Sequence, residues 1–343
     1  MATIIPTTPA PPPGVTAGAV RQAFAAHRVN WIDIAIWVVA IGAYFVVPDY
    51  LSLGTTVLIM ILFTLSLDLA VGYGGIDTLG QGAFFGVGGY AAAFWALHVT
   101  GEPISGLFVG AAAAAVLGVI SGAMILRTRG LTLIMITLAI SSMLEQFAVT
   151  ATSITGGDDG LTGYTIHPVL GIFPFDIYFQ TAYFYCLAAL AVCFVICRIV
   201  VNSPFGLTVR GIRENPVRMR LLGVPIKTRL IGLFTLSGAI AGVAGALSAQ
   251  VTGLIGTDTL TFLVSGNALI ALILGGFGRL YGAFLGAALL EIFSDRLAAA
   301  YPFHWQLGLG ILLILAVRFL PNGLTGVIDK ATKRGGHPEH LDS

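Results

Sequence analysis

Residues 55–99 read TTVLIMILFTLSLDLAV, then GYGGIDTLGQG, then AFFGVGGYAAAFWALHV. Two apolar runs, each close to the roughly 20 residues that a helix needs to cross a bilayer, flank a short polar segment rich in glycine. Both runs are continuous, whereas a strand of a membrane barrel alternates apolar and polar residues over about 10 positions. Because a backbone in lipid must satisfy its own hydrogen bonds, this pattern predicts transmembrane helices.

The composition of the whole chain supports a membrane protein. Of its 343 residues, 57% are hydrophobic and 10% are charged, against about 25% charged residues in an ordinary soluble domain. The net charge of +1 provides no broad field to attract anionic partners. These values exclude a soluble enzyme, a nucleic-acid-binding protein and a disordered scaffold. We therefore predict an all-α, polytopic transmembrane helix bundle.

About ten apolar spans can be placed along the chain. They cover residues 31–47, 55–71, 82–99, 104–126, 131–149, 181–201, 230–251, 262–274, 280–295 and 307–319. The eighth span is short, and the ninth follows it after a glycine-rich turn. We expect a flexible, proline-rich tail at residues 1–30, a transmembrane domain at residues 31–320 and a second tail at residues 321–343.

The distribution of basic residues predicts the orientation of the spans. If the N-terminus is cytoplasmic and the ten spans alternate, all of the 17 Lys and Arg residues except Arg296 fall on the inner side, as the positive-inside rule requires. The longest outer loop, residues 150–180, contains Asp158, Asp159 and Asp176 and no basic residue. Its many glycines and prolines predict a cap of turns. Both termini are therefore expected in the cytoplasm, and both tails with them.

Pairs of glycines four residues apart recur within the spans. Such pairs lie on one helix face and let two backbones approach closely, which is how membrane helices commonly pack. The pairs are Gly82/Gly86, Gly106/Gly110, Gly118/Gly122, Gly238/Gly242 and Gly282/Gly286. They predict a tightly packed bundle but do not identify what it carries.

Four polar residues are candidates for a translocation path. Asp77, Thr78 and Gln81 lie among the five glycines of residues 72–82, and Asn267 lies near the middle of its span. An interrupted helix, with free backbone groups and polar side chains along a solute path, is typical of transporters. The alternative for residues 72–82 is a plain cytoplasmic turn.

The other chemically active residues form no recognisable site. Asp33, Glu145 and Glu291 lie near span ends, where each can reach the membrane interface. The six histidines are scattered, and the three cysteines have neither Cys-x-x-Cys spacing nor a neighbouring histidine. We therefore predict no catalytic residue, no metal site and no cofactor in this chain, and that it is not an enzyme.

The segment 202–229 is predicted to be a structured cytoplasmic loop. Asn215 followed by Pro216 is typical of an N-cap and first helical position, and Gly223 of a helix end, so a short helix is expected at residues 217–222.

This short helix presents two kinds of side chain. Val217 and Leu221 are four residues apart and share a face, whereas Arg218 and Arg220 point elsewhere. Such a helix fits a groove on a partner; the alternative is a basic loop that simply obeys the positive-inside rule. The chain has no Gly-Lys pair, so it is not itself a P-loop ATPase.

Several blocks in this order resemble the LivM-type permease subunits of branched-chain amino acid ABC importers, over nearly all of residues 31–328. The blocks are GY at 72–73 through LG at 79–80, AFFG at 83–86, RTRG at 127–130, TLA at 137–139, TGG at 155–157, DGL at 159–161, SPFG at 203–206, REN at 213–215, GV at 223–224, SG at 237–238, AG at 241–242, GAL at 245–247, GG at 275–276, Gly278, Gly282 and GA at 286–287.

The resemblance implies a permease of the bacterial inner membrane that works in a complex. Its partners would be a second, homologous permease, two ATP-binding subunits that bind the ATP, an extracytoplasmic solute-binding protein and the lipid bilayer. Residues 203–224 would form the coupling loop that docks on an ATP-binding subunit. The residues expected to couple are Arg213, Glu214, Asn215, Val217, Arg218, Leu221 and Gly223. Arg218 and Arg220 stand where small residues are usual, which implies an acidic groove on the ATPase.

Some positions depart from the family pattern and bear on the solute. Ile76 and Asp77 stand where glutamine and an apolar residue are common, Gln81 where histidine is frequent, Asn267 where glutamate is, and Asp68 where asparagine is. Branched-chain amino acids are the leading solutes, with urea, amides and aromatic acids as alternatives.

Two other function classes compete with the importer. A stand-alone secondary transporter or channel would need an ion-coupling group at the midplane. A membrane-embedded enzyme would need clustered catalytic groups at one interface.

Overall fold

The computed structural model describes residues 37, 40–42, 44, 50–125, 128, 130–168, 179–302, 304–319 and 323–326. The chain forms two units, Met1–Val46 and Val47–Ser343, and every helix discussed below belongs to the second. The first predicted span and the two predicted tails lie outside the described residues, apart from the few positions just given.

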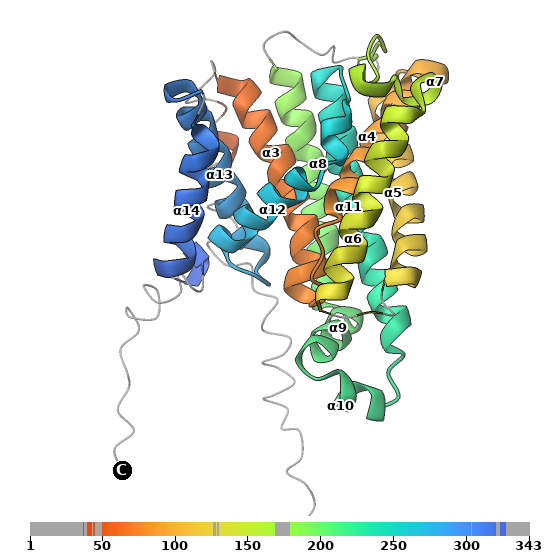
Figure 1. Cartoon of the computed structure of the whole chain (residues 1–343), viewed down its shortest axis with the longest axis vertical. Helices are drawn as coiled ribbons and strands as arrows, with labels where there is room; N and C mark the ends of the chain where they lie inside the picture. Colours follow the sequence, from red (N-terminus) through yellow and green to blue (C-terminus); the bar gives the residue numbers. More distant parts are fainter. Residues whose placement is uncertain are drawn as a thin grey trace, which may run out of the picture. The chain divides into compact units, whose positions relative to one another are not determined.

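The described residues form helices joined by turns (Figure 1). The elements are α3 Leu51–Leu67, η2 Asp68–Tyr73, α4 Gln81–His98, α5 Pro103–Ile125, α6 Leu131–Thr150, α7 Thr152–Thr155, η3 Gly157–Asp159, α8 Gln180–Asn202, α9 Pro204–Glu214, α10 Pro216–Leu221, α11 Ile226–Thr252, η4 Thr257–Leu260, α12 Phe262–Gly275, α13 Leu280–Ala300 and α14 Trp305–Phe319. Within these ranges there is no strand, only one isolated β-bridge between Leu161 and Ile255. The all-α prediction is confirmed.

Each of the second to tenth predicted spans corresponds to a helix, but these helices are not equivalent. Five of them are long and apolar enough to cross a membrane: α3 with η2, α5, α6, α8 and α11. Helices α12 and α13 meet this standard only as a pair, and the pair is bent by 115° at its break. Helix α4 is not among the apolar spans, and the apolar part of α14, Trp305–Leu315, is shorter than a full span.

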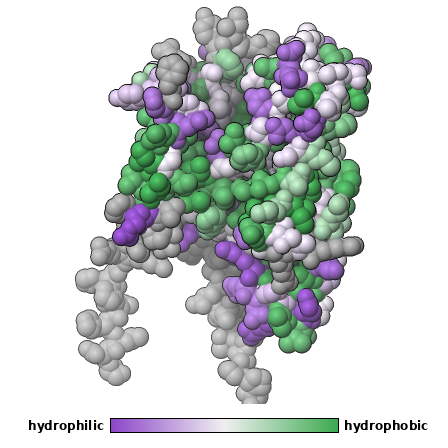
Figure 2. Space-filling view, viewed as in Figure 1, coloured by the Kyte–Doolittle hydropathy of each residue, from purple (hydrophilic) through white to green (hydrophobic). Residues whose placement is uncertain are grey.

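Burial distinguishes central helices from peripheral ones. In the most apolar window of each helix, 72% of the residues of α3 and 61% of those of α11 are buried, against 28% for α5 and 22% for α6. On the face shown in Figure 2, hydrophobic residues gather over the middle of the helices and hydrophilic residues gather at both ends. This surface pattern is expected of a helix bundle that sits in a bilayer with both ends in water.

Glycines create the contacts at the centre of the bundle. Gly88 of α4 lies against the backbone of Gly242 of α11, and Gly110 of α5 lies against the same two residues. At Gly245 of α11, a Cβ atom would collide with the carbonyl oxygen of Phe85 in α4. The predicted close packing is confirmed for Gly110 and Gly242, members of the predicted pairs in α5 and α11, whereas α4 contributes Gly88, which belongs to no predicted pair.

A strip of chain that is not α-helical, and that includes the 3-10 turn η4, lies along another face of α4. The strip, residues 253–261, follows α11 and contacts α4 through Ile255 at Gly89, Leu260 at Gly86 and the carbonyl oxygen of Thr261 at Gly82. These three glycines are four and three residues apart, so they form one smooth face of α4. The pair Gly82/Gly86 therefore receives this strip and the start of α12, not another full helix.

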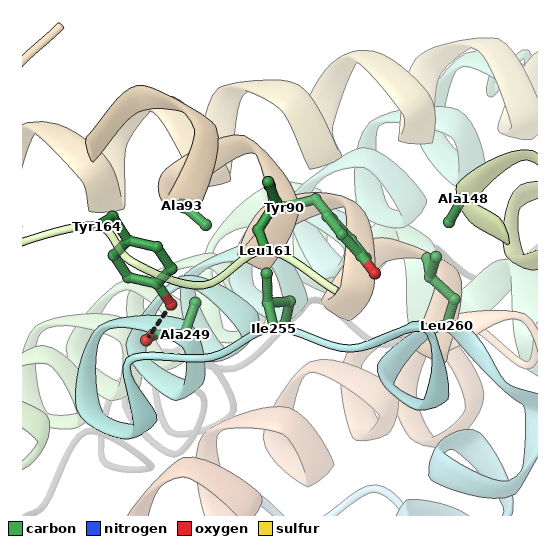
Figure 3. Packing of buried hydrophobic residues seen from close by; sticks show 8 residues of the cluster. All are labelled: Tyr90, Ala93, Ala148, Leu161, Tyr164, Ala249, Ile255 and Leu260. Atoms are coloured by element: carbon green, nitrogen blue, oxygen red, sulfur yellow. Dashed lines mark hydrogen bonds between the residues drawn. The ribbon is translucent and has the colours of Figure 1, made fainter. Parts of the chain in front are cut away.

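Turns after α6 cover one end of the bundle. The backbones of Leu161 and Ile255 exchange two hydrogen bonds of 3.0 and 3.1 Å, and the Tyr164 hydroxyl donates to the Ala249 carbonyl at 2.7 Å (Figure 3). Around them lies a buried apolar cluster that also contains Tyr90 and Leu260. The predicted cap of turns is found at residues 151–164, and it holds the upper end of the strip in place.

We predict that Gly245→Ala lowers the thermal stability of the detergent-solubilised chain, because the added methyl group forces α4 and α11 apart. Overpacking of this kind costs about 1–3 kcal/mol. The matched control is Gly310→Ala in α14, where a Cβ atom would meet nothing within 4 Å. Thermal unfolding followed by size-exclusion chromatography compares them. Equal unfolding temperatures for Gly245→Ala and the unmodified chain would show that the glycine contacts do not hold the bundle.

Candidate functional site

Helices α9 and α10 form a separate small unit at the end of the bundle opposite the cap (Figure 1). Asn215 is the N-cap of α10, since its Oδ1 accepts a hydrogen bond of 3.0 Å from the Arg218 N–H. At the other end, Gly223 has a φ of +78°, and its N–H donates to the Arg220 carbonyl at 3.0 Å. The Val224 N–H donates to the Met219 carbonyl at 3.1 Å, which completes a Schellman motif. The predicted short helix and its capping residues are confirmed.

Helix α10 projects away from the other helices and has no buried residue. Its apolar side chains are highly exposed: 66% for Val217, 84% for Leu221 and 70% for Leu222. Arg218 and Arg220 are exposed beside them. We call these five residues the coupling surface. An exposed apolar group of this kind, rimmed by charges, is typical of a protein-binding site.

The coupling surface rests on a firmly held α9. Val209 and Ile212 of α9 are buried, and Met219 of α10 lies against Gly211 of α9. The guanidinium of Arg229 lies 5.5 Å from the centre of the Phe205 ring. Met219 thus packs α10 on α9, and Arg229 ties α9 to the start of α11.

Two arginines of α9 reach the end of α3. The Arg210 guanidinium lies 4.9 Å from the centre of the Tyr73 ring, and Arg213 Nη1 donates to the Gly72 carbonyl. The stem of Arg213 also covers Gly75. Glu214, another predicted coupling residue, is exposed at the end of α9.

The predicted path residues Asp77, Thr78 and Gln81 lie between η2 and the first turn of α4. Gln81 is fully buried, and its Nε2 donates to the hydroxyl oxygens of Ser66 in α3, at 3.2 Å, and Ser237 in α11, at 2.8 Å. The Thr78 hydroxyl is also buried and accepts from the Gly80 N–H at 3.1 Å, whereas Asp77 is exposed. Gln81 thus joins three central helices.

Asn267, the fourth predicted path residue, lies elsewhere. Ser265 Oγ accepts from the Gly82 N–H at 2.6 Å, so that side of α12 faces α4. Asn267 is two residues further along, about 200° around the helix, and faces a cavity. The structure therefore does not bring Asn267 together with Gln81.

The cavity has a volume of about 530 Å³ and lies between α3, α12, α13 and the start of α14. Its lining combines aromatic rings, hydroxyls, an amide and two carboxylates. The lining residues are Tyr50, Ser52, Leu53, Thr56, Asn267, Leu290, Glu291, Ser294, Asp295, Ala298 and Trp305. We call it the acidic cavity, since it has two carboxylates and no lysine or arginine among these residues.

Sequence reasoning did not find the acidic cavity. Glu291 was expected only to reach the membrane interface, and Asp295 was not singled out. The available signal was their spacing, because carboxylates four residues apart lie on one helix face. Within the described parts of the chain, the acidic cavity included, no group of three His, Cys, Asp or Glu residues is placed to hold a metal ion.

Comparison with known proteins agrees with this architecture. Residues 50–317 match the family described as "Branched-chain amino acid transport system / permease component". The chain is 29% identical to the permease LivM of Escherichia coli K12, over 85% of this chain and 73% of that one. It is 34% identical to the guanosine ABC transporter permease NupQ of Bacillus subtilis, over 38% of this chain and 39% of NupQ.

A second Escherichia coli permease, LivH, is 31% identical over 36% of this chain and 40% of its own length. No solved structure matches the chain. The family match covers most of the helices described above, and the relatives are transport permeases. The chain is a multi-pass protein of the bacterial inner membrane and belongs to the family of branched-chain amino acid transport permeases.

Proposed function

We propose that this chain is the LivM-type permease subunit of an ATP-driven importer for branched-chain amino acids or related small solutes. The observation that carries this proposal is the coupling surface: exposed apolar side chains on a capped, two-turn helix outside the bundle. Apolar side chains exposed to water outside the bundle are unfavourable unless a partner covers them, so they indicate a binding surface.

The partners follow from the relatives. The chain resembles both LivM and LivH, permeases of the same transport system in Escherichia coli, so a homologous second permease beside it is the natural arrangement. Two ATP-binding subunits would cover the coupling surfaces of the two permeases and bind ATP, while an extracytoplasmic protein would deliver the solute at the cap. The exposed Arg218 and Arg220 favour an acidic groove on the ATPase.

We further propose ten spans with both termini in the cytoplasm. The two ends of the segment 255–278 contact opposite ends of the bundle, which supports this topology. Ile255 pairs with Leu161 of the cap, whereas the Gly278 N–H donates to Asp68 next to α9. The strip and α12 together therefore run from one end of the bundle to the other. Helix α13 then returns, since its 21 residues extend about 32 Å.

The acidic cavity is the strongest candidate for a solute path. Its carboxylates and the Asn267 amide suit the ammonium group of an amino acid, and Tyr50, Leu290 and Trp305 suit an apolar side chain. In this scheme Asn267 contacts the solute. The other predicted path residues, Asp77, Thr78 and Gln81, lie at the junction of α3, α4 and α11 and would act on the path indirectly. Gln81 is hydrogen-bonded there to two serines.

A stand-alone secondary transporter or channel is the alternative. It would use the acidic cavity for an ion or proton and would leave the coupling surface uncovered. The two functions differ in whether an ATP-binding subunit protects α10.

Cysteine labelling tests both the orientation and the docking. A membrane-impermeant maleimide should label Leu254→Cys, beside the cap, only from outside, and Leu221→Cys only in inside-out vesicles. Both leucines are exposed, at 47% and 84%, whereas the native Cys186, Cys193 and Cys197 are buried and should stay unlabelled.

Co-expression with the ATP-binding subunits should protect Leu221→Cys but leave Leu254→Cys unaffected. Labelling of Leu221→Cys from outside would refute the orientation. Equal labelling with and without the ATP-binding subunits would refute the docking and favour the stand-alone transporter.

The acidic cavity predicts a charge effect on uptake. In proteoliposomes that contain the complete importer, Glu291→Gln should raise the KM for leucine about tenfold or more, because a charge-assisted hydrogen bond to the ammonium group is lost. Glu145→Gln in α6 is the matched control, since Glu145 does not line the cavity. An unchanged KM would remove Glu291 from the path, whereas failure of the unmodified importer to take up leucine would refute the proposed solute.

A further inference from the structure

The chain is wound differently where it continues from the central helix α3. From Asp68 to Tyr73 the chain forms a π-helix, and it closes with a hydrogen bond of 3.0 Å from the Gly74 N–H to the Leu69 carbonyl. Such wide turns are rare in proteins and occur frequently at functional sites. This turn stands between α3 and the glycine-rich break before α4.

Asp68, the first residue of this π-helix, ties it to the turn between α12 and α13. Its side chain is completely buried, and Oδ1 accepts a hydrogen bond of 2.7 Å from the Gly278 N–H. The other oxygen, Oδ2, has no hydrogen-bond partner in the described structure. Gly278 has a φ of +70°, which favours glycine at this point of the turn.

Only a glycine at position 72 permits this contact. A Cβ atom on Gly72 would collide with Asp68 Oδ1 and would approach the Gly278 nitrogen to 2.6 Å. The backbone of the π-helix thus touches the α12–α13 turn directly, with the Asp68 carboxylate beside the contact.

Helix α9 holds the same point from the other side. The Gly72 carbonyl accepts from Arg213 Nη1, and the Tyr73 ring lies under the Arg210 guanidinium. We define the coupling junction as Asp68, Gly72, Tyr73, Arg210, Arg213 and Gly278, contributed by α9, η2 and the α12–α13 turn.

The helices that meet at the coupling junction also form the walls of the acidic cavity. The other end of α3 supplies Tyr50 to Thr56, α12 supplies Asn267, and α13 supplies Glu291 and Asp295. A displacement of α9 would therefore act on three of the cavity's four walls through one small contact region.

We propose that Asp68 and Arg213 are positioning residues that transmit motion of the ATP-binding subunits from α9 to α3 and the α12–α13 turn, and so control the shape of the acidic cavity. This inference rests on the proposed importer function. The competing route runs through the covalent connections of α9 to α8 and of α10 to α11. If that route carried the motion, loss of the arginine contact would not affect transport.

The test is the number of solute molecules taken up per ATP hydrolysed by the complete importer in proteoliposomes. Arg213→Ala should leave ATPase assembly and the thermal unfolding temperature nearly unchanged, since Arg213 lies at the surface. Uptake per ATP should fall about tenfold or more, as expected when a coupling contact rather than the fold is removed. Arg213→Lys keeps a charged donor for the Gly72 carbonyl and should restore most of the uptake per ATP.

Lys227→Ala is the matched control, because Lys227 is exposed at the start of α11 and belongs neither to the coupling surface nor to the coupling junction. Its uptake per ATP should equal that of the unmodified importer. Asp68→Asn keeps an acceptor for the Gly278 N–H, so the chain should still fold. This variant tests whether the negative charge of the carboxylate contributes to uptake per ATP. Combined with Arg213→Ala it should add little further loss, because residues on one route are not additive.

Unchanged uptake per ATP in Arg213→Ala would overturn the proposal, as would equal losses in Arg213→Ala and Lys227→Ala. The proposal would also be overturned if the losses of uptake per ATP in Arg213→Ala and Asp68→Asn multiplied in the double variant. If no ATP-binding subunit assembles with the unmodified chain, the proposed importer function itself fails.

Discussion

Close backbone contact between α4, α5 and α11 is the interaction on which the rest of this protein depends. Lipid tails are as apolar as the side chains of the spans, so burial of apolar surface does little to bring helices together inside a membrane. Close packing must therefore stabilise the contacts between helices, and glycine allows the closest approach of two backbones. Gly88, Gly242 and Gly110 meet at one point, and the neighbouring Gly245 accommodates the Phe85 carbonyl. Gln81 then adds hydrogen bonds to α3 and α11 at the end of the same contact.

This packing makes an irregular backbone possible inside the bundle. The strip at residues 253–261 is not an α-helix, and such a segment is tolerated at membrane depth only where protein covers its polar groups. The glycine face of α4 and the cap residue Leu161 provide that cover. Helix α12, which follows the strip, has 14 residues, and its Asn267 lines the acidic cavity.

The two candidate functional regions, the coupling surface and the acidic cavity, are connected to opposite ends of α3. The coupling surface on α10 is connected through α9 to the π-helical end of α3, and the acidic cavity lies at the opposite end of α3. A rigid helix transmits displacement along its length, so distance alone does not separate the two regions. The hydrogen bond from the Gly278 N–H to Asp68 joins this end of α3 to the α12–α13 turn, and α12 and α13 also line the cavity.

The sequence by itself determined the features that depend on neighbours along the chain. The apolar spans follow from run length, the ends of α10 from Asn215 and Gly223, and the packing faces from glycines four residues apart, because helix geometry brings those residues together wherever the helix lies. Only the tertiary structure decided which polar residues meet. Gln81, which was predicted to lie along the path, joins three helices, while Asn267 shares a cavity with Glu291 and Asp295. Arg213 is 141 residues from Gly72, and Gly278 is 210 residues from Asp68. Such contacts depend on how each helix is rotated and how deep it sits, and a run of apolar residues on all sides of a helix contains no information about either.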